Sequence, residues 1–258
     1  MSGMPIIAIS SRDNPHIKAA VRLRDAAGDH MRFFLEGFRL CADALDSGYA
    51  PAQVFLTQAA RAKYGTEPLE QAAGQVFGIT EAVAEKLGDT KSPQGVFGVF
   101  QRQEKRDIQE FWRPGGKYIA LENVQDPGNL GAISRTAEAL GIDGLLVCGG
   151  CDVFHPKALR ASMGALLRLP VTQADDLPAA LRDSILPRYA AVPDRDAGSI
   201  RGRDFTRGGV IAVGSEAHGL SEETIAACGH KITVPMQGRA ESLNAAAAAA
   251  ILMWEMVR

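Results

Sequence analysis

The sequence predicts an α/β protein whose C-terminal part is built on a parallel β-sheet, and two observations carry this prediction. From residue 117 onward, short apolar runs typical of strands alternate strictly with longer segments typical of helices. Such an alternation indicates a parallel sheet with helices on both faces. The last helix begins with six alanines and continues as Ile-Leu-Met-Trp, so we expect protein to surround it on every side.

The elements of this part are placed by the apolar runs and by the turn residues between them. Strands are expected at residues 118–121, 144–147, 189–192, 210–213 and 232–234. Helices are expected at residues 130–140, 156–166, 177–185, 221–228 and 243–257. Ligands of parallel sheets bind at the carboxyl ends of strands, so the loops that follow the strands are where chemistry is expected.

The first hundred residues predict a smaller α/β unit. Helices are expected at residues 14–27, 36–45 and 80–87, and strands at 54–56, 76–79 and 96–100. A polar stretch that ends in Pro-Gly-Gly, residues 101–116, interrupts the pattern. We therefore expect a first domain at residues 1–105, a linker at 106–116 and a second domain at 117–258.

The composition is that of an ordinary globular protein, with 46% hydrophobic and 22% charged residues among 258. The formal net charge of −2 means that any nucleic-acid binding must come from local basic patches. The longest apolar run, residues 245–254, is too short to cross a bilayer. We expect no membrane association.

The four cysteines bear on the cellular compartment and on metal binding. Residues 1–10 lack a basic start followed by an apolar run, so we expect a reduced, cytoplasmic environment. Cys148 and Cys151 could belong to a zinc site only if Cys228 and His230 supplied the second pair, which would be an unusual spacing. We therefore expect free thiols and no metal.

Three loops at the carboxyl ends of predicted strands hold the candidate site residues. In the first loop, Asn129 can cap the following helix, and Arg135 lies six residues further on, where its guanidinium suits a phosphate. In the second loop, Glu216 stands between two glycines, a good position for contact with a ligand. His218 of this loop is a weaker candidate base, and Ser221 is expected to cap the next helix.

The third loop, residues 235–244, opens the alanine-rich helix. Ser242 could be the N-cap of that helix, and Asn244 is a poor helix former placed just before a mainly apolar segment. Polar groups at such a crowded junction need a specific partner or role.

At these loops the sequence resembles the SpoU (TrmH) family of RNA ribose 2′-O-methyltransferases, within the SPOUT superfamily. The first motif is Asp126-Pro-Gly-Asn129-Leu-Gly-Ala-Ile-Ser-Arg135-Thr-Ala-Glu-Ala-Leu-Gly141, and the second is Val213-Gly-Ser-Glu216-Ala-His-Gly-Leu-Ser221. The third is Val234-Pro-Met236-Gln-Gly-Arg-Ala-Glu-Ser242-Leu-Asn244. The N-terminal part is similar to the family's ribosomal-protein-like RNA-binding domain. One departure from the family pattern is Glu122, where an Asp often opens the first motif.

The resemblance implies a fold, a cofactor and a set of site residues. It implies a C-terminal SPOUT domain with a deep trefoil knot, S-adenosylmethionine as cofactor, and a homodimer formed through that domain. The implied catalytic positions are Arg135, Asn129, Glu216, Ser242 and Asn244. The implied cofactor-binding positions are Gly214, Val234, Met236 and Leu243.

The implied reaction is methyl transfer to a ribose 2′-hydroxyl of RNA, with ribosomal RNA as the expected substrate. Arg135 would bind the adjoining phosphate and stabilise the developing alkoxide, because an arginine stays protonated. RNA contacts are expected from the basic residues Arg12, Lys18, Arg39, Lys157, Arg160 and Arg168. The alternatives are a tRNA ribose methyltransferase, a non-catalytic RNA-binding or ribosome-assembly protein and, less favoured, a small-molecule methyltransferase.

Overall fold

The computed structural model describes residues 5–25, 31–103, 107–194 and 196–258. Contacts divide the chain into two compact units. The first unit comprises Met1–Glu104 and Phe154–Arg160, and the second comprises Lys105–Val153 and Ala161–Arg258. A short stretch of the C-terminal sequence, residues 154–160, therefore belongs with the N-terminal residues, a feature that the domain boundaries expected from the sequence do not contain.

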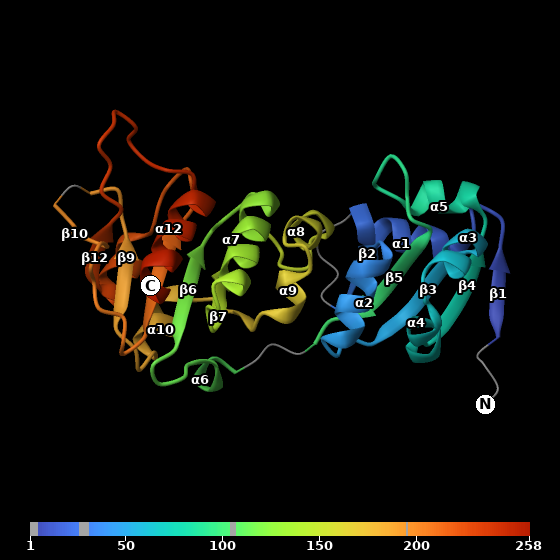
Figure 1. Ribbon diagram of the computed structural model, residues 1–258, viewed down its shortest axis with the longest axis horizontal. Coiled ribbons are helices and arrows are strands. Elements are labelled where there is room, and N and C mark those ends of the chain that lie inside the picture. The colour runs from blue at the N-terminus through green and yellow to red at the C-terminus, as the bar shows by residue number, and fades with distance from the viewer. Residues whose placement is uncertain (1–4, 26–30, 104–106, 195) are drawn as a thin grey trace. The chain divides into compact units, whose positions relative to one another are not determined.

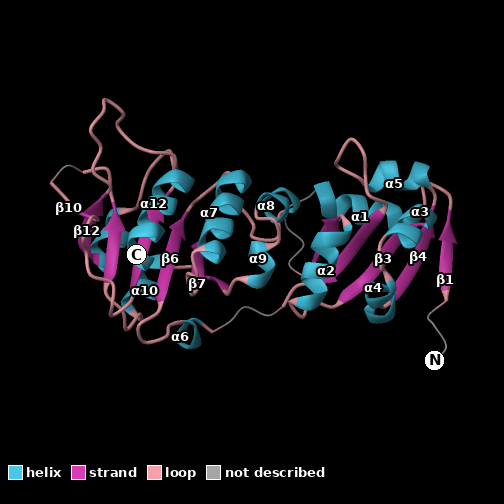
Figure 2. Cartoon of the chain, viewed as in Figure 1, coloured by secondary structure: helices cyan, strands magenta, loops and turns pink. Residues whose placement is uncertain are grey.

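The first unit is a five-stranded mixed sheet with the strand order β1-β4-β3-β5-β2. Its strands are β1 (Ile6–Ile9), β2 (Arg32–Glu36), β3 (Pro51–Thr57), β4 (Gln75–Ile79) and β5 (Val96–Gln101). Its helices, seen with the strands in Figure 2, are α1 (Pro15–Asp25), α2 (Phe38–Asp46), α3 (Gln58–Lys63), α4 (Glu67–Ala72) and α5 (Glu81–Leu87). Strand β5 runs antiparallel to both of its neighbours, and the other pairs are parallel.

Aromatic side chains form much of the core of this unit. Phe55 and Phe77 stack with their ring centroids 5.0 Å apart, and Phe34 stacks on Phe97 at 6.1 Å. All four rings are almost fully buried. Phenylalanines in neighbouring strands therefore join the sheet to α1 and α5, because large aromatic surfaces supply most of the burial that a small unit can obtain.

The predicted elements of the first unit are confirmed, but the prediction was incomplete. The helices expected at residues 14–27, 36–45 and 80–87 are α1, α2 and α5, and the three expected strands are β3, β4 and β5. Strands β1 and β2 and helices α3 and α4 were missed. Each of the two helices has six residues, too few to show a clear helical period.

The second unit is a seven-stranded sheet in which every pair of neighbours is parallel. The strand order is β10-β12-β9-β11-β6-β7-β8. The strands are β6 (Lys117–Glu122), β7 (Gly144–Cys148), β8 (Val171–Gln173), β9 (Arg188–Ala191), β10 (Gly198–Ser199), β11 (Gly209–Gly214) and β12 (Gly229–Thr233). The five predicted strands form the centre of this sheet, which confirms the predicted fold class, and the two missed strands are short edge strands.

Helices cover both faces of this sheet. The helices of this unit are α6 (Ile108–Phe111), α7 (Pro127–Ala139), α9 (Ala165–Arg168), α10 (Leu177–Arg182), α11 (Glu222–Cys228) and α12 (Ala245–Val257). The remaining helix, α8 (Pro156–Ala161), belongs with the first unit except for its last residue. On one face, Leu181 of α10 and Cys228 of α11 pack with Tyr118 and Leu146 of the strands. Helices α7 and α12 pack against each other, and Figure 1 shows them side by side along the sheet.

The prediction of a single helix at residues 156–166 is wrong. The structure has two short helices there, α8 and α9, because Met163 and Gly164 adopt positive φ angles of 54° and 84°. A left-handed backbone conformation ends an α-helix, and it is disfavoured for a residue with a Cβ such as Met163. The break falls close to the point where the chain passes from one unit to the other.

The expectation that protein surrounds the last helix on all sides is wrong for the single chain. Ala249 and Met253 of α12 are fully buried, but Ile251 and Trp254 are 40% and 56% exposed. Ala247 is also exposed, so the spacing of these three residues places them on one stripe of the helix. Among the helices that the structure describes, none has the length and apolar character needed to span a membrane.

Candidate functional site

The three loops singled out in the sequence leave the same edge of the seven-stranded sheet. They follow β6, β11 and β12, whose carboxyl ends point in one direction because all strand pairs are parallel. Side-chain hydrogen bonds between the loops confirm that they converge, and the second and third loops also line a cavity at this edge.

A cavity of about 390 Å³ opens at the ends of β9, β11 and β12. Its lining includes all four expected cofactor-binding residues, Gly214, Val234, Met236 and Leu243. Two of the expected catalytic residues, Glu216 and Ser242, also line it, whereas Asn129, Arg135 and Asn244 do not. The remaining walls are mostly small or apolar residues from the end of β9, from α11 and from the first turns of α12.

The contribution of the strand β9 to the cavity was missed by the sequence reasoning. Ala191, Val192 and Pro193 lie in the wall where this strand ends. The signal was available, because the strand predicted at residues 189–192 ends at the same edge as its parallel neighbours. The loop after this strand, which begins Pro193-Asp194, matches none of the three motifs, so it was not singled out.

A chain of amide and carboxylate groups joins the three loops. Asn244 accepts hydrogen bonds through Oδ1 from the backbone N–H groups of Ala246 and Ala247, at 2.9 and 3.3 Å. Its Nδ2 donates to Oδ1 of Asn129 at 3.1 Å, and Nδ2 of Asn129 donates to Oε1 of Glu216. Because the helix N–H groups require Oδ1 of Asn244 as their acceptor, the orientation of each amide in this chain is fixed.

Two predicted helix caps are wrong by a few residues. Asp126, rather than Asn129, is the N-cap of α7, and its Oδ1 accepts from the backbone N–H of Asn129 at 2.9 Å. Asn244, rather than Ser242, is the N-cap of α12. In each case the helix begins at a different residue than expected, and the side chain of Asn129 is thereby left free to bond across the loops. Ser221 caps α11 as predicted, with Oγ accepting from the N–H of Thr224.

The second loop makes a tight turn that requires glycine. The backbone N–H of Gly219 donates to the carbonyl of Ser215 at 2.9 Å, and Gly219 has a φ of 68°. A Cβ on Gly214 would lie 2.1 Å from the carbonyl carbon of Gly219 and 2.4 Å from the nitrogen of Leu220. No side chain can occupy position 214 unless the turn moves.

Arg135 is exposed on α7 and is not joined to the other candidate residues. It forms no hydrogen bond or ion pair with any residue that the structure describes. Six residues along an α-helix correspond to a rotation that leaves Arg135 about 120° around the axis from Asn129. The structure therefore leaves this guanidinium free to meet an external anion, but it does not place it in the cavity wall.

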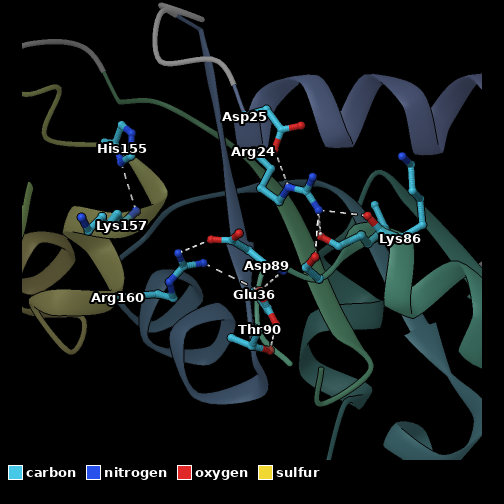
Figure 3. Close-up of polar contacts among 11 residues, drawn as sticks. Arg24, Asp25, Glu36, Lys86, Asp89, Thr90, His155, Lys157 and Arg160 are labelled. Atoms are coloured by element: carbon cyan, nitrogen blue, oxygen red, sulfur yellow. Dashed lines mark hydrogen bonds and ion pairs between the residues drawn. The ribbon is translucent and has the colours of Figure 1, made fainter. Parts of the chain in front are cut away.

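Several basic residues expected to bind RNA are already paired within the first unit. Arg12 bonds Glu85 at 2.8 Å, and Lys18 bonds Asp13 at 2.9 Å, which lowers the pKa of that carboxyl group. Arg160 pairs with Asp89, and its Nη1 lies 3.8 Å from Oε2 of Glu36. Figure 3 shows the three side chains together. A stretch without acids in the sequence is therefore not a free basic patch, because acids distant in sequence neutralise it.

Of the other three residues expected to bind RNA, one is paired with a carboxylate and two are not. Arg168 forms two hydrogen bonds with the carboxylate of Glu138, one of them at 2.8 Å, and this contact lowers the pKa of Glu138. Arg39 and Lys157 are exposed and form no ion pair with the residues described. Their side chains remain available for phosphate contacts.

The alternative of a zinc site finds no support in the structure. Burial raises the pKa of Cys228 to about 12 and also raises the pKa of Cys148, so neither thiol readily becomes a thiolate ligand. The exposed ring of His230 stacks against Tyr189 at 5.5 Å. Within the described ranges of the chain, no three His, Cys, Asp or Glu residues are grouped so as to hold a metal ion.

Comparison with known proteins gives two family models and several relatives. Residues 116–254 match the SpoU rRNA Methylase family, and residues 14–98 match an MRM3-like substrate binding domain. A tRNA/rRNA methyltransferase of Synechocystis, itself uncharacterized, is 31% identical over 98% of this chain and 94% of its own length. A 23S rRNA (uridine(2479)-2′-O)-methyltransferase of Streptomyces viridochromogenes is 29% identical over 91% of this chain and 84% of its own.

A solved structure supports the same relationship. The chain is similar to an AdoMet-bound rRNA methyltransferase from Sinorhizobium meliloti, with a TM-score of 0.84 and 29% identity. The similarity covers 97% of each chain, so it extends over both units.

Proposed function

Because the chain belongs to the SpoU rRNA methylase family, we propose that it transfers a methyl group from S-adenosylmethionine to a ribose 2′-hydroxyl of ribosomal RNA. The observation that carries this proposal is a cavity lined by the second and third loops, which the chain from Asn244 through Asn129 to Glu216 joins to the first loop. Sites for small molecules and cofactors have volumes of about 300–1,000 Å³, a range that includes this cavity.

The lining of the cavity suits S-adenosylmethionine. Val192, Val213 and Ile232 offer apolar surface for a flat base, and the backbone of Gly214–Leu220 offers hydrogen-bonding groups. Gly214, Val234, Met236 and Leu243 would hold the cofactor there. When bound, S-adenosylmethionine supplies a methyl group attached to a sulfonium sulfur, and the sulfur leaves readily because it becomes a neutral thioether.

The residues of the chain would position the ribose and stabilise charge. The 2′-oxygen would take the methyl group, S-adenosylhomocysteine would remain, and the hydroxyl proton would pass to a phosphate oxygen or to water. Arg135 would bind the phosphate beside the ribose and stabilise the developing alkoxide. Asn129 and Glu216 would orient the ribose, and Ser242 and Asn244 would shape the loop around the methyl group.

The test of this function compares ribose methylation in cells that have the protein and cells that lack it. We expect one 2′-O-methylated ribose of ribosomal RNA to disappear when the protein is removed. Loss of a methyl group from transfer RNA instead would favour the tRNA methyltransferase alternative. Unchanged RNA, together with no binding of S-adenosylmethionine in calorimetry, would favour the non-catalytic alternative.

We further propose the trefoil knot that the family resemblance implies. Strand β12 is the last in sequence, yet it lies between β10 and β9. The chain then returns as α12 to pack against β11 and β6, beyond β9. This connectivity supports a passage of the final segment through the connection between β9 and β11, the part of the chain that contains β10.

A homodimer through the second unit is supported by the exposed face of α12. Ala247, Ile251 and Trp254 form an apolar stripe on a helix that packs against α7, the helix that carries exposed Arg135. Homodimer interfaces are more apolar than other protein surfaces, and tryptophan is frequent among their dominant contacts.

We predict that Trp254→Glu gives a monomer with little methyl transfer. Burial of the new carboxylate without a partner would oppose association, and Arg135 lies on the helix beside this surface. Sedimentation analysis and turnover on RNA measure the two effects. Ile185→Glu is the matched control, because Ile185 is 67% exposed in the same unit but outside α12. A dimeric Trp254→Glu variant would contradict this assignment of the interface.

RNA binding and domain organisation complete the proposal. We assign substrate binding to the domain at residues 1–105, followed by a linker at 106–116 and the methyltransferase domain at 117–258; the match of residues 14–98 to a substrate-binding model supports this. Arg39 and Lys157 are the best placed for phosphate contacts, because they have no ion-pair partner among the described residues. Arg12, Lys18, Arg160 and Arg168 would have to exchange an intramolecular carboxylate for the phosphate.

A cytoplasmic location is supported by four free cysteines.

A further inference from the structure

Glu122 is a buried carboxylate at the end of β6, and it lies outside the group of expected catalytic residues. Its side chain is close to fully buried, with 7% of the residue exposed. Oε2 accepts from the backbone N–H of Ser221 at 2.8 Å. Oε1 accepts from the hydroxyl of Ser221 at 2.8 Å and from the hydroxyl of Thr224 at 2.7 Å. No basic side chain among the described residues pairs with it.

These three donors place Glu122 at one end of the second loop. Ser221 ends that loop and caps α11, and Thr224, which is completely buried, lies in the first turn of the helix. A buried carboxylate is tolerated only when hydrogen bonds replace its hydration, so the three contacts and the position of the loop depend on each other.

The other end of the loop is held by the same strand. Gly214 pairs with Glu122 in the parallel register of β11 and β6. Strand β6 therefore fixes Gly214 through the sheet and Ser221 through the Glu122 carboxylate. Between these two points, the seven consecutive residues Gly214–Leu220 line the cavity.

We propose that Glu122 is a positioning residue for methyl transfer. By fixing Ser221, it holds the Gly214–Leu220 loop in the shape that binds S-adenosylmethionine, without touching cofactor or RNA itself. This inference rests on the proposed function, which places the cofactor in this cavity. The Glu122 carboxylate reaches both Ser221, the N-cap of α11, and Thr224, in the first turn of that helix.

The energetic consequence follows from the population of the binding-competent loop. When only a fraction of molecules has the loop in place, the apparent dissociation constant increases by the reciprocal of that fraction. The increase is the same for every ligand that uses the loop backbone in the same way. The dissociation constants of S-adenosylmethionine and S-adenosylhomocysteine should therefore increase by an equal factor, whereas the KM for RNA should not change.

The experiment compares Glu122→Gln with Glu223→Gln in the full-length protein. Glutamine keeps the shape of the side chain but removes its charge and presents an N–H₂ group to donors. Glu223→Gln removes the same charge from the exposed first turn of α11, where the carboxylate forms no hydrogen bond or ion pair with a described residue. Calorimetry gives the dissociation constants of both cofactor forms, and steady-state kinetics gives KM and kcat.

We expect Glu122→Gln to increase the dissociation constants of S-adenosylmethionine and S-adenosylhomocysteine by about tenfold. The kcat at saturating S-adenosylmethionine should stay close to that of the parent. Glu223→Gln should bind within about twofold of the parent, as surface changes usually do. Equal cofactor binding by parent and Glu122→Gln, even with a lower melting temperature, would overturn the proposal and leave Glu122 a purely structural residue.

Two further variants keep the test decisive if Glu122→Gln does not fold. Thr224→Val and Ser221→Ala each remove one hydroxyl donor to Glu122 while keeping the backbone N–H of Ser221. Each should weaken both cofactor forms to a similar extent, and unchanged binding in both folded variants would overturn the proposal. If the parent and Glu223→Gln themselves fail to bind S-adenosylmethionine, the assignment of the cavity is wrong, and the role of Glu122 is overturned with it.

Discussion

Replacement of Arg135 by alanine is expected to lower methyl transfer by about a hundredfold or more while leaving cofactor binding unchanged. Removal of one group that stabilises a developing oxyanion costs about 10²–10³ in rate in well-studied enzymes. Arg135 is exposed, has no hydrogen-bond or ion-pair partner in the described part of the chain and does not line the cavity. Its loss should therefore affect neither the fold nor the cofactor site.

The measurement is single-turnover methyl transfer to the identified RNA, with calorimetric titration of S-adenosylmethionine on the same variant. Arg207→Ala is the matched control, because Arg207 is also exposed in the second unit and is not a proposed site residue. Arg135→Lys tests the geometry, since a lysine keeps the charge but not the planar fork that fits a phosphate. Near-normal turnover by Arg135→Ala would contradict the assigned role.

The second large effect is expected from Gly214→Ala. The new Cβ would lie 2.1 and 2.2 Å from the carbonyl carbon and oxygen of Gly219, and both are backbone atoms. The turn must therefore move, and it forms part of the cavity wall. Overpacking of this kind costs about 1–3 kcal/mol, which corresponds to about 5–150-fold in cofactor affinity if the bound loop must return to its original shape.

Gly238→Ala is the control for this prediction. Gly238 lies in the third loop, and a Cβ at that position would meet no atom within 4 Å. We expect this variant to bind S-adenosylmethionine like the parent. If Gly214→Ala binds equally well and melts at the parent's temperature, the tight approach of the two ends of the turn does not determine the cofactor site.

Much of the fold could be predicted because the central strands are continuous apolar runs. A strand buried on both faces, such as β11 (Gly209–Gly214), carries its own signal in five or six adjacent residues. The edge strands β8 and β10 have three and two residues and are defined by hydrogen bonds to a neighbour. A pairing partner distant in sequence cannot be recognised from a segment that short.

The candidate site shows the same division. The three loops could be found because parallel strands end at one edge, so the motifs at Asp126, Gly214 and Val234 had to meet there. The internal contacts of the site could not be found. The amide chain through Asn129 depends on where two helices begin, and a shift of two or three residues decides whether a side chain caps a helix or bonds across loops.

The sequence by itself determined the parallel sheet, the succession of its central strands and their helices along the chain, and the loops that gather at its carboxyl edge, because these follow from local apolar patterns. Only the tertiary structure decided which charges are free, since Glu36, Asp89 and Glu138 come from distant segments to pair with Arg160 and Arg168. Only the tertiary structure also gave Glu122 its contacts, 99 residues or more along the chain. Long-range polar pairs require both partners to be placed to within about 0.5 Å, and local sequence patterns carry no information at that scale.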